Sequence, residues 1–375
     1  MKPHILFRFS LFFIIYTALT FYIGWNLWAW LHTSFGFQHI WLLGVLVVLV
    51  SYSYIIGRFL HLFSVFKIMG AYWFGIFQYS LLLLPLANLV VLIFTIFNYP
   101  QESVIIWTGS IVLLAFIVLL LYGTFNAYSP VVRTYSLEIP KLAGNRTHLR
   151  IAMASDMHFG NLSGLSHLHR LIKNVNQLKP DLILLPGDII DDDPKPFIQK
   201  KMGDVMKDLS APLGVYGVLG NHEYYGGAIP EFVKEMNRIG IKILQDEIVK
   251  IDEAFYLVGR KDKTDSKRKS MQELVENLEH SYPIIMMDHQ PAEIKQAVET
   301  DIDLLLSGHT HRGQMAPNHL ITRRIFDLDW GHQQFNQLHA IVSSGFGFWG
   351  PPLRIGSRSE IIQIEVTFIK NKEEK

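Results

Sequence analysis

The chain has 375 residues, carries 34 Lys and Arg against 33 Asp and Glu, and contains no cysteine. Its length exceeds the usual size of a single domain, and its balanced charge argues against a nucleic-acid-binding patch. The absence of cysteine excludes disulfide bonds and thiolate metal sites, so any metal ion must be held by His, Asp, Glu or Asn side chains.

Residues 1–125 are almost free of charge. Their cations are Lys2, Arg8, Arg58 and Lys67, and their acid is Glu102. A soluble surface needs many more charged side chains than this. Four apolar stretches approach the roughly 20 residues that cross a bilayer as a helix. They are Ile5–Trp25, Ile40–Ile56, Tyr72–Phe97 and Val104–Tyr122. The pattern predicts an all-α bundle of four transmembrane helices, hence a multi-pass protein of the cell membrane in contact with the lipid bilayer.

The positions of the cations predict an orientation. Lys and Arg precede the first stretch, separate the second from the third, and follow the fourth, whereas the loops 31–39 and 98–103 have none. Positively charged loops stay on the cytoplasmic side. We therefore expect the amino terminus and the whole C-terminal domain to be cytoplasmic.

The rest of the chain is typical of a layered domain. We expect a linker over 126–148, a domain over 149–370 and a charged tail over 371–375. Within 149–370, short apolar runs alternate with helix-like stretches, which favours an α/β or α+β fold. The expected strands are Leu149–Ala154, Leu182–Leu185, Val215–Leu219, Ile284–Met287, Leu304–Leu306, Ala340–Ser343 and Ile361–Phe368, with a hairpin over Ile248–Val258. The expected helices are Ser163–Leu178, Pro196–Leu209, Pro230–Ile239, Ser270–His280 and Pro291–Val298.

Five of these strands run directly into a polar cluster. The clusters are DMH at 156–158, GD at 187–188, GNHE at 220–223, DH at 288–289 and GHTH at 308–311. Loops at one edge of a layered sheet converge, so these side chains are candidates for a shared site. Their oxygen and imidazole groups suit Mn, Fe or Zn and are numerous enough for two divalent ions. A carboxylate must bridge the two ions, and Asp188, held in a tight turn by Gly187, is the natural bridge.

Such a site would favour phosphoryl chemistry. Two metal ions clamp a phosphoryl oxygen, stabilise the attacking and leaving groups, and lower the pKa of a bound water so that hydroxide exists near neutral pH. A remaining imidazole could protonate the leaving oxygen.

The five clusters, with GDIID at 187–191 as the second, resemble the signature of the calcineurin-like metallophosphoesterases over about residues 149–368. The resemblance implies a sandwich of two mixed β-sheets flanked by helices. It implies one metal ion bound by Asp156, His158, Asp188 and His311, and a second bound by Asp188, Asn221, His289 and His309. It also implies that His222, the histidine of GNHE, contacts the substrate phosphate and acts as the general acid.

Two further segments, HTHRGQ at 309–314 and GFGFWGPPLR at 345–354, resemble the membrane-attached bacterial branch of that family. We expect Phe348 and Trp349 to shape the substrate pocket or to touch lipid. Arg312 and Arg354 could orient phosphate through forked hydrogen bonds, although single arginines near such loops more often form structural ion pairs. Asp191 could support the site by hydrogen bonding.

Two classes of function follow. The first is a membrane-anchored phosphohydrolase acting on a phosphomonoester, phosphodiester or pyrophosphate, most plausibly on a lipid-linked substrate. The alternative is a non-catalytic metal-binding regulatory module attached to a four-helix membrane sensor or transporter. The complete ligand set favours the hydrolase, as does the scarcity of intramembrane charge of the kind that transport sites use. The basic run 261–269 is interrupted by Asp262 and Asp265, which favours a solvated loop over a binding site.

Overall fold

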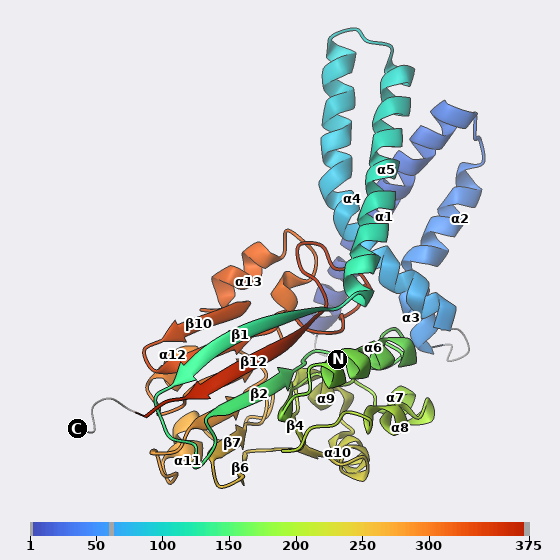
Figure 1. The fold of residues 1–375 in the computed structure, drawn as a ribbon. Coiled ribbons are helices and arrows are strands. Elements are labelled where there is room, and N and C mark those ends of the chain that lie inside the picture. Colours follow the sequence, from blue (N-terminus) through green and yellow to red (C-terminus); the bar gives the residue numbers. More distant parts are fainter. Residues whose placement is uncertain (1–2, 60–63, 371–375) are drawn as a thin grey trace. The chain divides into compact units, whose positions relative to one another are not determined.

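The computed structural model describes residues 3–59 and 64–370 and forms two compact units (Figure 1). The helical unit contains residues up to Gly123 together with 350–353, and the sheet unit contains Thr124–Trp349 and the residues from Arg354 onward. The charged tail expected at 371–375 lies outside the described residues.

The helical unit contains three helices that are long and apolar enough to cross a membrane. Their candidate spans are Leu6–Phe35, Val65–Ile96 and Gln101–Tyr128. They lie in α1 (Pro3–Phe35), α4 (Ser64–Ile96) and α5 (Gln101–Tyr128). The span in α1 continues to Phe35, the span in α4 begins at Val65, and the span in α5 passes both predicted ends.

The second predicted span is shorter than expected, because the stretch Ile40–Ile56 is broken in two. Helix α2 (Ile40–Ser51) has 12 residues, and α3 (Ser53–Phe59) follows it. The hydroxyls of Ser51 and Ser53 donate to backbone carbonyls three residues earlier, at 3.0 and 2.6 Å, and such bonds compete with the regular helix. Twelve helical residues rise about 18 Å, which is less than the roughly 30 Å hydrocarbon core of a bilayer.

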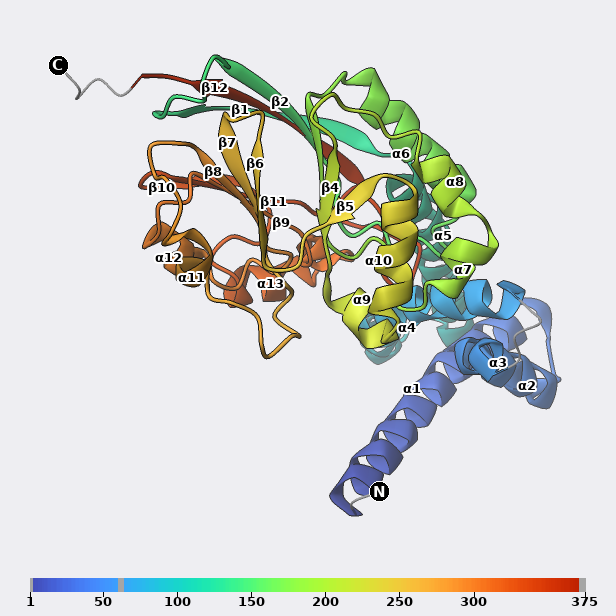
Figure 2. The ribbon, with the colours of Figure 1, turned by 90° about the horizontal axis from the view of Figure 1, so that it is seen from below.

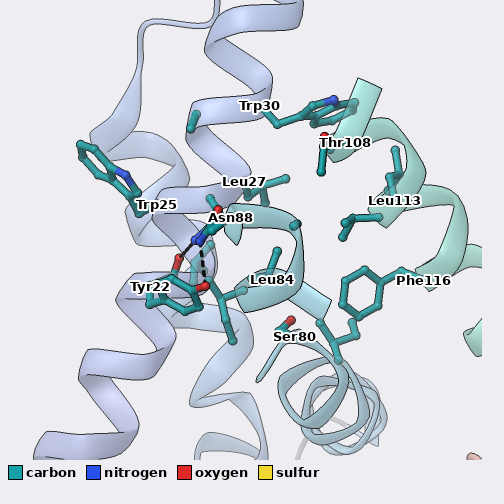
Figure 3. Close-up of a pocket in the computed structure, with 18 of the residues that line it drawn as sticks. Tyr22, Trp25, Leu27, Trp30, Ser80, Leu84, Asn88, Thr108, Leu113 and Phe116 are labelled. Carbon is teal, nitrogen blue, oxygen red and sulfur yellow. Dashed lines mark hydrogen bonds between the residues drawn. The ribbon is translucent and has the colours of Figure 1, made fainter. Parts of the chain in front are cut away.

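An apolar cavity of about 780 Å³ lies between the helices of this unit (Figure 3). Its wall includes polar contacts, and in one of them the Asn88 amide donates to the Tyr22 hydroxyl at 2.8 Å. The Tyr22 backbone carbonyl in turn accepts from the Asn26 side chain at 2.8 Å. These bonds give the side chains of Asn26 and Asn88 partners within the helices, as an apolar surrounding favours.

The sheet unit is a sandwich of two six-stranded sheets, each with parallel and antiparallel pairs. The first sheet has the order β1 (Val131–Ile139), β12 (Glu360–Phe368), β2 (His148–Met153), β3 (Leu182–Pro186), β4 (Val215–Val218) and β5 (Ile241–Ile243). The second has the order β10 (Gly331–Phe335), β11 (Leu338–Val342), β9 (Leu304–Ser307), β8 (Ile284–Met287), β7 (Phe255–Gly259) and β6 (Glu247–Ile251). The predicted fold class, an apolar helical part followed by an α/β sandwich of two mixed sheets, is confirmed.

Helices cover both outer faces of the sandwich (Figure 2). The first sheet carries α6 (Leu165–Gln177), α7 (Lys195–Gln199), α8 (Met202–Met206) and α10 (Ile229–Arg238), and the second carries α11 (Met271–Val275) and α12 (Ile294–Val298). Between the sheets, a buried core joins residues such as Ile151 and Leu184 of the first to Leu257 and Ile285 of the second. This apolar layer fixes the edge from which the polar loops emerge.

The expected linker at 126–148 is wrong for its central part, because residues 131–139 form β1. This strand pairs in parallel with β12, from Val131 opposite Glu360 to Ile139 opposite Phe368. Its inward side chains alternate with exposed Thr134, Ser136 and Glu138. The alternation is typical of a half-buried strand. Judged by composition alone, however, the polar residues of the segment make it resemble a linker.

Candidate metal centre

The polar clusters meet where strands of both sheets end. Asp156, Asp188 and Asn221 follow β2, β3 and β4 of the first sheet, and His289 and His309 follow β8 and β9 of the second. The last cluster continues into the short 3₁₀ turn η1 (His311–Gly313), and GNHE opens helix α9 (Asn221–Gly226). The centre is therefore assembled across the seam between the two sheets.

Several of these side chains are held on unusual backbone. Left-handed φ values occur at Asp156 (51°), His158 (46°), Asp188 (50°), His309 (71°) and His311 (48°). Non-glycine residues adopt this region rarely and at a cost, and such residues gather at functional sites. The surrounding hydrogen bonds and packing must stabilise these turns.

Two neighbouring glycines make room for the carboxylates. A Cβ atom on Gly220 would lie 2.2 Å from Asp188 Oδ1, and one on Gly308 would lie 2.2 Å from Asp156 Oδ2. These separations are far below contact distance, so any side chain there would displace a carboxylate. Steric exclusion of a side chain thus explains the leading glycine of both GNHE and GHTH.

One group of candidate ligands contains Asp156, His158 and His311. The Nε2 atoms of His158 and His311 are 3.1 Å apart, and His311 Nε2 is 3.6 Å from Asp156 Oδ1. Burial lowers the pKa of His158 to about 3 and also lowers the pKa of His311, so both rings are neutral at physiological pH. Neutral imidazoles offer the lone pairs that a metal ion needs.

A second group contains Asp188, His289 and His309, with Asn221 between the two rings. Asn221 Oδ1 is 3.2 Å from His289 Nε2 and 2.8 Å from His309 Nδ1. The other ring nitrogen of His289 lies 2.8 Å from the Pro186 carbonyl, which orients the ring. Such a bond to the far nitrogen is the usual support of a metal-binding histidine.

Asp188 lies between the two groups. Its Oδ2 is 3.1 Å from His289 Nε2 and 3.8 Å from His158 Nε2, and its Oδ1 accepts the backbone N–H of His222 at 2.9 Å. Burial opposes ionisation, but the charge and hydrogen bond of His289 outweigh it, so the pKa of Asp188 stays below its usual range. An ionised carboxylate in contact with both groups is the arrangement that a bridging ligand requires. The donor set therefore fits two divalent ions.

His222 lies beside the candidate ligands and is paired with a carboxylate, that of Asp192. Its Nδ1 is 2.7 Å from Asp192 Oδ1, and its ring centroid is 4.7 Å from that of His158. Although burial opposes it, the hydrogen bond that His222 donates to Asp192 and the charge of Asp188 raise the pKa of His222 to about 9. The sequence had suggested Asp191 as the supporting acid. In the structure Asp192, at φ 56°, makes the short contact with His222, and Asp191 has a carboxylate oxygen within 4.8 Å of ring nitrogens of His158 and His222.

Glu223 connects loops of the centre through hydrogen bonds to their backbone. Its carboxylate accepts the backbone N–H groups of Gly220, Ile190 and Asp188 at 2.7, 3.0 and 3.2 Å. Burial and the charge of Asp188 raise the pKa of Glu223 to about 8. Its bonds position the turn that presents Asp188.

The two arginines proposed as phosphate contacts each have protein partners. Arg354 has no exposed surface, and its guanidinium donates to the carbonyls of Ser344, Gly345 and Gly347 at 2.7 to 3.1 Å. The same guanidinium lies 3.3 Å from Nδ1 of the candidate ligand His311, so Arg354 connects the 345–358 loop to the centre. Arg312 stacks its guanidinium 3.8 Å from the centre of the Trp330 ring. Long-range packing decides both placements, and no local pattern could have shown them.

Aromatic side chains form the rim of the centre beside His222. Trp349 is 59% exposed with its ring centroid 6.0 Å from that of His222, and Tyr225 is 65% exposed at 5.6 Å. Phe348 is instead buried against Tyr128 and His167. Of the two expected pocket residues, Trp349 is thus the one beside the centre.

Replacing Asp192 by Asn should shift the alkaline limb of the pH–rate profile to lower pH. A general acid works in its protonated form, so activity falls as pH rises through its pKa, and Asp192 helps to hold that pKa near 9. The measurement is kcat against pH for the wild type and for Asp192→Asn, with the exposed Asp204→Asn as the control. An unchanged alkaline limb in Asp192→Asn would contradict the assignment.

Comparison with known proteins places the chain in a family. The family model described as calcineurin-like phosphoesterase matches residues 149–313. A metallophosphoesterase of Aquifex aeolicus is 31% identical over 253 residues, which cover 65% of this chain and 95% of that protein. The chain belongs to the calcineurin-like metallophosphoesterase family. The family resemblance found in the five clusters is confirmed, and membership indicates a metal-dependent phosphoesterase.

Two other relatives are named as transmembrane proteins. Proteins of Danio rerio and Bos taurus, each named a transmembrane protein with a metallophosphoesterase domain, are 30% and 29% identical to this chain. Each alignment covers 66% of this chain and 60% of the relative, so the chain spans about 60% of their length. With its three candidate spans, this metallophosphoesterase is a membrane protein.

Proposed function

We propose that this metallophosphoesterase is a membrane-anchored hydrolase of phosphate esters that works with two divalent ions, Mn, Fe or Zn. The position of Asp188 between two groups of buried ligands is the observation that supports this proposal most strongly. Asp156, His158, Asp188 and His311 would hold one ion. Asp188, Asn221, His289 and His309 would hold the other.

The side chains around the ions have separate tasks. Two bound ions would supply Lewis acidity toward the phosphoryl group and lower the pKa of a water molecule. Asp188 sets the spacing of the two ligand groups, and Glu223 fixes the turn that carries Asp188. Asp192 occupies Nδ1 of His222, which leaves Nε2 to protonate the leaving oxygen.

We further propose that the ester belongs to a lipid-linked substrate. The chain is anchored in the membrane, so its site works close to a bilayer surface, and exposed Trp349 and Tyr225 give the rim an apolar character beside His222. A phosphomonoester, a phosphodiester or a pyrophosphate could each be bound by the same ligands.

The sheet unit is proposed to be cytoplasmic. Helices α4 and α5 are consecutive candidate spans, so the segment before α4 and the segment after α5 lie on the same side. Arg58 precedes α4 and Lys67 lies in the first turn of α4, Arg133 and Lys141 follow α5, and the loop 98–103 between the helices has no cation. This argument holds whether or not α2 crosses the bilayer. Cleavage of the sheet unit by protease added outside intact cells would refute it.

Turnover by the full-length protein in detergent tests the hydrolase directly. We expect hydrolysis of a chromogenic phosphomonoester or phosphodiester with added Mn, and its loss on addition of a chelator. The same protein should be tested on a phospholipid monoester and a lipid pyrophosphate in mixed micelles. Folded, metal-loaded protein that hydrolyses none of these esters would contradict the proposal and favour a regulatory module.

A further inference from the structure

Helix α13 (His319–Ile325) presents apolar side chains to its surroundings. Leu320, Ile321 and Ile325 are 56%, 59% and 66% exposed, and no residue of this helix is buried. One exposed leucine would be ordinary, but three large aliphatic side chains on a seven-residue helix form a patch that calls for a partner.

The same helix is cationic. Arg323 and Arg324 are exposed, and the described part of the chain gives neither of them an ion pair. Arg323 also acts electrostatically on Arg312, which lies before the helix. A short helix that exposes aliphatic side chains beside arginines has the chemistry of a segment that lies in the headgroup layer of an anionic membrane.

Hydrogen bonds connect α13 to the end of a membrane span. The last turn of α5, from Thr124 to Tyr128, belongs to the sheet unit, and its Asn126 side chain donates to the Arg354 carbonyl at 3.1 Å. The loop that contains Arg354 is bonded to the segment before α13. The Ala316 N–H donates to the Ile355 carbonyl at 2.7 Å, and the Gln314 side chain donates to the Trp349 carbonyl at 3.0 Å.

We propose that α13 is a membrane-docking helix that inserts Leu320, Ile321 and Ile325 into the surface of an anionic bilayer, with Arg323 and Arg324 at the lipid phosphates. The chain itself keeps a bilayer close, because the sheet unit begins within a candidate span. Trp349, whose backbone is bonded to Gln314 ahead of α13, is exposed beside His222. Docking would bring lipid headgroups to the rim of the metal centre. This inference rests on the proposed function, because it would explain how a lipid-linked substrate reaches the centre. Docking itself can be measured without hydrolysis.

The test measures contact of α13 with lipid. Because the chain has no cysteine, one fluorophore can be placed at Ile321→Cys in the full-length protein, reconstituted at one copy per nanodisc. The control is Glu253→Cys, whose native side chain is 83% exposed and precedes the amino end of β7, at the sheet edge opposite the metal centre. Nitroxide-labelled lipid should quench the probe at 321 several-fold more strongly than the probe at 253 when phosphatidylglycerol is present.

The same nanodiscs test whether docking depends on charge and whether lipid or a second copy of the chain covers α13. Arg323→Gln with Arg324→Gln should remove most of the additional quenching at 321, and discs of phosphatidylcholine alone should show weaker quenching. Equal quenching at 321 and 253 would overturn the proposal. Quenching at 321 that changes neither with the lipid charge nor with removal of the two arginines would also overturn it. Protection of the probe at 321 that appears only in discs with two copies would overturn it in favour of a second copy of this chain. No outcome depends on hydrolysis, so failure of docking and failure of the proposed activity are distinguishable.

Discussion

Replacing Asp188 by Asn should abolish metal-dependent turnover while the protein stays folded in the membrane. The substitution removes the carboxylate that lies between His158 of one ligand group and His289 of the other. Loss of a preorganised electrostatic group of this kind costs at least roughly 100-fold in kcat. The measurement is the Mn-dependent hydrolysis rate of full-length protein in detergent.

The same variant should lose the stabilisation that the ions provide. A ligand present at about 100 times its Kd stabilises the folded state by about 2.7 kcal/mol, so Mn should raise the unfolding temperature of the wild type but not of Asp188→Asn. Without metal the variant should be less stable than the wild type, because in the folded protein the charge and hydrogen bond of His289 hold the pKa of Asp188 below its usual range, and the substitution removes that interaction. The control is Asp193→Asn, since Asp193 is exposed in the same loop. Normal metal binding and turnover by Asp188→Asn would refute the bridging role.

Replacing His222 by Ala should reduce kcat by about 10² to 10⁴ for an ester with a poor leaving group, as expected when a general acid is lost. The loss should be much smaller for p-nitrophenyl phosphate, because p-nitrophenolate leaves without a proton. His222 is not among the proposed metal ligands, so the rise of the unfolding temperature with Mn should persist. The comparison of kcat for an alkyl ester and a nitrophenyl ester measures this directly.

His169→Ala is the matched control, because His169 is an exposed histidine of α6. It should leave both rates unchanged. Equal losses for the two leaving groups in His222→Ala would contradict proton donation and would leave His222 only a binding role.

The elements of the sandwich could be predicted where sequence and burial agree. Strands such as Ile284–Met287 are fully buried and read as continuous apolar runs, so their bounds agree with β8. Strand β1 was missed because one of its faces is polar. The expected helix Pro196–Leu209 divides into α7 and α8 because Lys201 adopts a left-handed φ of 51°, which no pattern of side chains revealed.

The composition of the centre could also be predicted, since its side chains directly follow strands that converge at one edge. The contacts of each side chain could not. Three aspartates stand in succession at 191–193, and only the backbone decides which one reaches His222. Arg354 looked available for phosphate until its carbonyl partners, seven to ten residues earlier, were known.

The position of the centre at the seam between the sheets links the stability of the protein in the cell to its supply of metal. Its buried polar ligands come from both sheets. Without ions, these ligands are polar groups removed from water that do not pack as apolar side chains would, so they stabilise the contact between the sheets poorly. Occupancy by metal is then part of maturation as well as of catalysis. A cell short of the ion would hold less of this protein, since quality-control proteases remove chains that open more often. Its abundance would then report the supply of metal.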